Sequence, residues 1–244
     1  MKQNIIITIA IFICSGAVAQ DYWSIAPAFP TNCYSQEGDY NEKLGAAIKK
    51  NKTEMDAKSD ALKKKNSNMS KEDQMKMATQ QMNMTPAQIK QMQEDQMNMM
   101  TMMQTMQERQ TEVTNRYNEL ETQYRNEFAT KLGPIESEMR KLPDGEGTPQ
   151  WAIDKGGQLK AQYDKEYNAL CAKYFTGADS PFKLWLADYK KYLLETEIPY
   201  TNKTQDMQSK QYGLAADNSV AVMDAVGKYL GYCKTIFGLR KPYP

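Results

Sequence analysis

A strongly marked helix start at Thr85 constrains the fold more than any other local feature. In the stretch MTPAQI, residues 84–89, Thr85 is suited to be the N-cap, and Pro86 takes the first helical position, where a missing N–H costs nothing. Gln88 completes a capping box three residues after the threonine. The next stop signal is the LGP at 132–134, so the sequence predicts one helix of about 46 residues, roughly 70 Å long.

Apolar residues recur along this helix at alternating spacings of three and four. The positions are 89, 92, 96, 99, 103, 106, 110, 113, 117, 120 and 124, with glutamine at 96 and 110. Such a stripe is typical of a coiled-coil or hairpin seam, and an unpaired helix of this length is marginal in water. The amphipathic segment 41–65 and a short helix over 75–82 are the natural partners. We therefore expect residues 41–142 to form a Met-rich helical hairpin or coiled coil.

The capped helix start also resembles a motif from a known class of proteins. Met84, Thr85 and Gln88 are similar to the L-T-x-x-Q motif of the Spy-type periplasmic chaperones, with methionine in place of leucine. The resemblance covers about five residues, and capping physics alone produces the same pattern. It implies a small, all-helical, exported protein that cradles unfolded clients.

The remaining segments complete an all-α prediction. Residues 20–40 hold aromatic residues and prolines without a helical period, which indicates an extended N-terminal arm. Helical periodicity returns in segments that begin near 149, 181 and 219, so we expect a C-terminal three-helix bundle over 149–238. Nothing has the pattern of a strand or a Gly-rich phosphate loop.

The first nineteen residues have the pattern of a secretory signal peptide. A lysine precedes an apolar run, and Ala17-Val18-Ala19 supplies the small-x-small cleavage signal. The run is shorter than the roughly 20 residues that span a bilayer, and no second run follows it. We therefore expect residues 1–19 to be removed, leaving a secreted or periplasmic protein without a membrane span.

Export gives the cysteines a possible structural role, because disulfides persist in oxidising compartments. Cys33, Cys171 and Cys233 remain after cleavage, and three pairings are possible. In an up-down-up bundle, Cys171 and Cys233 would lie at the same end on apolar faces. We favour a Cys171–Cys233 disulfide, with the two pairings that involve Cys33 left open.

Composition argues against several classes of function. The chain has no histidine, which removes the usual general base and the commonest zinc ligand. Its 31 basic residues are balanced by 30 acidic ones, so no overall positive charge supports nucleic-acid binding. We expect a non-catalytic protein without a cofactor.

The methionines therefore offer the best candidate site. Most of them continue the apolar seam, but Met97 and Met100 fall outside it on a helical wheel. Methionine is flexible and polarizable, which suits an adaptable binding surface. The predicted interaction surface comprises Met92, Met97, Met99, Met100, Met102, Met103 and Met106.

Two functions follow from this surface. The first is protein–protein interaction in the cell envelope, as a scaffold subunit that self-associates or as a chaperone-like binder of a protein client. The alternative is copper(I) binding, because thioethers are soft ligands and Met99, Met103 and Met106 are spaced so that their sulfurs could converge.

Overall fold

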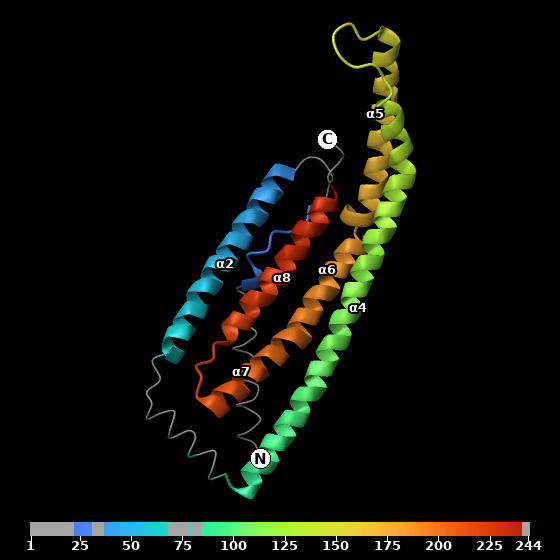
Figure 1. Ribbon diagram of the computed structural model, residues 1–244. Coiled ribbons are helices and arrows are strands. Elements are labelled where there is room, and N and C mark those ends of the chain that lie inside the picture. The colour runs from blue at the N-terminus through green and yellow to red at the C-terminus, as the bar shows by residue number, and fades with distance from the viewer. Residues whose placement is uncertain (1–21, 31–36, 68–78, 80–83, 241–244) are drawn as a thin grey trace.

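The computed structural model describes residues 22–30, 37–67, 79 and 84–240, and every regular element within these ranges is helical (Figure 1). The predicted all-α class is confirmed. The elements are α2 (Glu37–Ser67), α4 (Pro86–Met139), α5 (Gln150–Cys171), η1 (Ala172–Thr176), α6 (Pro181–Tyr192), η2 (Leu193–Glu197), α7 (Ile198–Tyr212) and α8 (Asn218–Leu239). None of these helices combines the length and the apolar composition that crossing a membrane requires.

The central element is α4, whose 54 residues would measure roughly 80 Å if straight. It begins where the capping pattern predicts, but it does not end at Gly133. Pro134 lies inside the helix, although it removes one backbone hydrogen bond. Leu132 and Ile135 on either side are buried, at 0% and 5% exposure, so packing against α5 offsets the break and α4 continues to Met139.

The pairing of the helices differs from the expected hairpin. α5 runs back along the end of α4, and the two form a long hairpin that projects from the body (Figure 1). α6 and α7 pack along the rest of α4. α2 lies instead along α8, so the expectation that segment 41–65 pairs with the Met-rich helix is wrong. The segment 75–82 lies outside the described residues except for Thr79.

A close approach explains why α2 prefers α8. Asn51 of α2 is buried and donates from Nδ2 to the carbonyl oxygen of Met223, at 2.9 Å. A Cβ placed on Gly227 would lie 3.0 Å from the same amide nitrogen. The small residue on α8 therefore lets the two helices meet at a polar contact that apolar periodicity does not reveal.

The predicted C-terminal helices start almost where expected, but they do not form a separate bundle. Tyr117 of α4, Trp185 and Tyr189 of α6 and Tyr232 of α8 make one aromatic cluster, with Tyr117 and Trp185 ring centroids 5.1 Å apart. Such pairs add to the burial of their large apolar surfaces. The core thus joins the Met-rich helix to the C-terminal helices in one body.

α5 and α6 each end in a π-helical turn. In η2 the helix does not stop at Pro199 but runs on into α7, where that proline takes one of the first two positions. The missing proline N–H is tolerated there, because N–H groups in a first turn have no intrahelical partner. A proline at position 199 would be expected to end or kink a helix, but the structure has a continuous helical segment with a π turn.

The predicted N-terminal arm is only partly extended. Trp23 is buried, its ring centroid lies 5.3 Å from that of Tyr229, and Lys190 lies over the indole face at 4.7 Å. α2 begins at Glu37, inside the segment predicted as the arm. The predicted signal peptide, residues 1–19, lies outside the described residues.

The favoured disulfide is wrong. Cys233 is a free thiol, buried on α8 at 3% exposure. It lies in contact with Tyr40 and Tyr229, whose hydroxyl groups interact with the sulfur. Helix α2, which supplies Tyr40, thus fills the place that a bundle of three C-terminal helices would leave beside Cys233. Cys33 lies outside the described residues.

Candidate interaction site: a methionine-lined groove

The capping box predicted at Thr85 fixes the beginning of the site. Thr85 Oγ1 accepts a hydrogen bond from the Gln88 backbone N–H at 3.3 Å, and the Thr85 N–H donates to Gln88 Oε1 at 2.7 Å. The two bonds satisfy N–H groups that would otherwise lack partners at the helix start. They also set the direction in which α4 leaves Met84.

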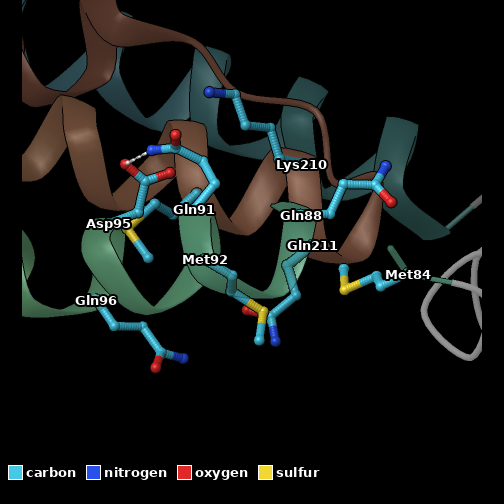
Figure 2. A pocket seen from close by; sticks show the side chains of 9 residues that line it. Met84, Gln88, Gln91, Met92, Asp95, Gln96, Lys210 and Gln211 are labelled. Carbon is cyan, nitrogen blue, oxygen red and sulfur yellow. Dashed lines mark hydrogen bonds between the residues drawn. The ribbon is translucent and has the colours of Figure 1, made fainter. Parts of the chain in front are cut away.

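Next to this cap, α4 and α7 form a groove with a volume of about 200 Å³. Its lining residues are Met84, Gln88, Gln91, Met92, Asp95, Gln96, Met207, Lys210 and Gln211. Figure 2 shows the side chains from the start of α4 on one side and those from the end of α7 on the other. Because pockets for drug-sized ligands usually measure at least about 300 Å³, this groove has the size for one or two side chains of a partner.

The chemistry of the groove is mostly neutral. Three thioethers and four glutamine amides make up most of the lining. Asp95 accepts a hydrogen bond from Gln91 at 3.5 Å, and its carboxylate lies 3.7 Å from the ammonium of Lys203. The one acidic side chain is therefore already paired within the protein. Thioethers and amides can contact both apolar and polar groups without a fixed charge.

The α7 side of the groove ends at a defined point. Gly213 has a φ of 61° and closes α7 in the left-handed conformation, with its N–H bonded to the Ser209 carbonyl oxygen at 2.8 Å. Residues with a Cβ rarely adopt this conformation. The glycine therefore sets where the chain leaves α7, just beyond Gln211 and the rim of the groove.

The inner face of α4 is rotated slightly from the predicted seam. The half-buried positions in its first half are 92, 95, 99, 102, 106 and 109, while 96, 103 and 110 are exposed. Asp95 pairs with Lys203, and Arg109 with Asp188 at 3.6 Å. These ion pairs with α6 and α7 turn charged residues inward, which a search for apolar repeats cannot predict.

This rotation divides the seven predicted surface methionines into three groups. Met92 lines the groove. Met99, Met102 and Met106 are half-buried, and Met106 packs against the core. The other three are exposed: Met97 at 63%, Met100 at 66% and Met103 at 38%. The seven methionines therefore do not form one surface. Met92 belongs to the groove, Met99, Met102 and Met106 form an inner row, and Met97, Met100 and Met103 form an outer row.

The proposed copper(I) ligands fall in different environments. Met99 and Met106 belong to the inner row, and Met103 belongs to the outer row. Copper(I) binding by these three stays a prediction. Among the described residues, no group of three or more His, Cys, Asp or Glu side chains is arranged to hold a metal ion.

Sequence reasoning missed two of the three groove methionines as site residues. Met84 was singled out only as the first residue of the motif at the helix start, and Met207 had no distinguishing pattern. Their shared position depends on the pairing of α4 with α7, which brings together methionines more than a hundred positions apart and has no local signal. The comparisons with known proteins give no further assignment: no protein family matches the chain, and neither a curated protein nor a solved structure was found to resemble it.

Proposed function

We propose that this chain is an exported, non-catalytic protein that binds a protein client through the groove between α4 and α7. The observation that carries the proposal is the lining of the groove, in which Met84, Met92 and Met207 surround a small open volume. A thioether surface can repack around different apolar side chains, so it suits a binder of variable sequences.

The glutamine amides support binding of a peptide more than of an apolar small molecule. Gln91 and Gln211 bring amide donors and acceptors to the rim of the groove. A client segment with one apolar side chain in the groove would leave its backbone N–H and C=O groups near these amides. The client's backbone N–H and C=O groups need hydrogen-bond partners when water is displaced, and the amides can supply them.

Export is proposed from residues 1–19, whose pattern fits a signal peptide. A client-binding role without nucleotide or metal chemistry also agrees with a chain that has no histidine. A scaffold role, in which the chain self-associates, is the other form of protein interaction expected from the sequence. It would use the outward side of α4 and not the groove.

The proposal is tested by the aggregation of an unrelated client, followed by light scattering. The chain should slow aggregation, and the double variant Met92→Gln with Met207→Gln should lose most of this effect, because amides replace two thioethers. Met97→Gln makes the same change at an exposed position outside the groove and should keep the effect. Equal activity of the double variant and the native chain would refute the groove as the binding site.

A further inference from the structure

The outward side of the first half of α4 carries an uncharged stripe of exposed residues. On a wheel of about 100° per residue, ten residues share this side, and all are exposed. The stripe comprises Ile89, Gln93, Gln96, Met97, Met100, Met103, Gln104, Gln107, Gln110 and Thr111. All five charged residues between 89 and 111 fall outside it: Lys90, Glu94, Asp95, Glu108 and Arg109.

Packing within one copy of the chain does not account for this stripe. α6 and α7 contact the opposite side of α4, and no other described element lies on its outer side (Figure 1). Met97 and Met100 nevertheless expose 63% and 66% of their surface. A surface helix normally places charged residues on its solvent side. A side without charge but rich in methionine has instead the composition of a protein–protein interface.

Three pairs of stripe positions match in residue type about Met100, whereas Ile89 and Thr111 differ and Gln110 has no counterpart in the stripe. Three positions away on each side is a methionine, and four and seven positions away on each side is a glutamine. These pairs are Met97 with Met103, Gln96 with Gln104, and Gln93 with Gln107. A two-fold axis at Met100 would bring each member of a pair level with the other member on a second, antiparallel helix. Thioether then meets thioether, and each amide meets an amide that can both donate and accept.

The flanking charges favour the same orientation. Lys90 lies beside the stripe at one end, and Glu108 and Glu112 lie beside the same flank at the other end. In an antiparallel pair centred on Met100, Lys90 comes within about one turn of Glu108 and Glu112 of the second copy. A parallel pair would put Lys90 about 18 to 22 residues along the axis from Glu108 and Glu112 of the second copy, so neither ion pair could form. The ion pair of Lys90 with Glu94 within one chain, at 3.8 Å, is exposed and weak, so it does not compete strongly.

We propose that the occupant of this stripe is a second copy of the chain, bound through antiparallel α4 helices with Met100 at the two-fold axis. The contact would extend over roughly 33 Å of helix. It is isologous, because the same surface serves both copies. The groove faces α7 on another side of α4 and shares only Gln96 with the stripe. The variants below change no residue that lines the groove, so their outcome is independent of the client-binding proposal.

The first experiment measures the mass of the purified chain against concentration by analytical ultracentrifugation. The native chain should form dimers. Met100→Glu and Met100→Lys should each weaken dimerisation at least about tenfold, because like charges meet at the axis. An equimolar mixture of the two variants should recover the dimer. Asn118→Glu, which introduces a charge five turns further along the same side, should dimerise as the native chain does.

A second experiment tests the orientation by mild oxidation of cysteine variants. Chains with Ile89→Cys and chains with Thr111→Cys should form a mixed disulfide-linked dimer when combined, and Ile89→Cys alone should stay at the level of the native chain. A monomeric native chain, an undiminished dimer in both Met100 variants, or no recovery on mixing would overturn the proposal. Efficient linkage of Ile89→Cys to itself would overturn the antiparallel arrangement.

Discussion

The indole N–H of Trp185 donates a hydrogen bond to the backbone carbonyl oxygen of Val113, at 2.7 Å. Both side chains are buried, with exposures of 0% and 1%. The bond ties α6 to the middle of α4 at a carbonyl that already belongs to a helix. It sets the rotation of α4 at the point where the Met-rich half meets the aromatic core.

Trp185→Phe should therefore lower the free energy of unfolding by roughly 2–4 kcal/mol, because it removes a buried hydrogen bond and leaves unfilled volume. The measurement is urea denaturation followed by circular dichroism. Trp151→Phe is the matched control, since Trp151 is 61% exposed, and it should change stability by less than about 0.5 kcal/mol. Equal effects of the two changes would contradict the role given to Trp185.

Glu127 should make stability depend on pH in the acid range. Hydrogen bonds from Lys173 and Lys131, with a further one from Tyr174, lower the pKa of Glu127 from 4.5 to about 2. A lowered pKa in the folded state contributes stability above the ordinary pKa, and this contribution is lost as pH falls from about 4.5 towards 2. Glu127→Gln should be less stable than the native chain above pH 5 or so, and the difference should shrink across this window.

The check on Glu127 is a series of urea unfolding curves between neutral pH and the acid limit of solubility. Glu119→Gln, at an exposed position of the same helix, should show no such convergence with the native chain. A constant difference between Glu127→Gln and the native chain across the window would mean that the carboxylate of Glu127 gains nothing from Lys173.

Cys233 should resist alkylation in the folded protein. Burial raises the pKa of its thiol to about 12, and only the thiolate is an effective nucleophile. Iodoacetamide at mildly alkaline pH should leave Cys233 unmodified without denaturant and modify it fully in urea, as read by peptide mass spectrometry. The same digest without reductant should contain no peptide linked through Cys233.

Gly227→Ala should destabilise the chain, although alanine is the better helix former by about 1 kcal/mol. The new Cβ would lie 3.0 Å from Asn51 Nδ2 and would press on the amide that bonds Met223. In the Asn51→Ala background this contact is absent, so Gly227→Ala should become neutral or stabilising there. A double-mutant cycle measures the coupling, and additive effects would show that the two residues do not interact.

Local signals in the sequence predicted where helices begin. The cap at Thr85, the proline after Ser180 and the start near Ser219 each depend on a few neighbouring residues, and α4, α6 and α8 begin within a residue of these points. Helix ends were less predictable. Pro134 lies between buried residues whose packing against α5 outweighs one lost hydrogen bond.

The pairing of helices could not be predicted in the same way. Asn51 meets α8 through a polar contact, and Asp95 and Arg109 orient α4 through ion pairs. These residues interrupt an apolar repeat instead of forming one. The groove could not be predicted either, because Met207 lies near Met92 only through the pairing of α4 with α7.

The contact between α2 and α8 also bears on how the chain acquires its structure. Asn51 and Met223 are 172 positions apart, so a large loop must close before this contact forms. Closing such loops slows folding, and proteins rich in distant contacts fold more slowly than those with local ones. During synthesis α2 lacks its main helix partner until α8 has emerged, and apolar residues that it later buries, such as Leu44, stay accessible over that interval. A chain of this topology should therefore complete its fold only after the last helix, α8, has been synthesised.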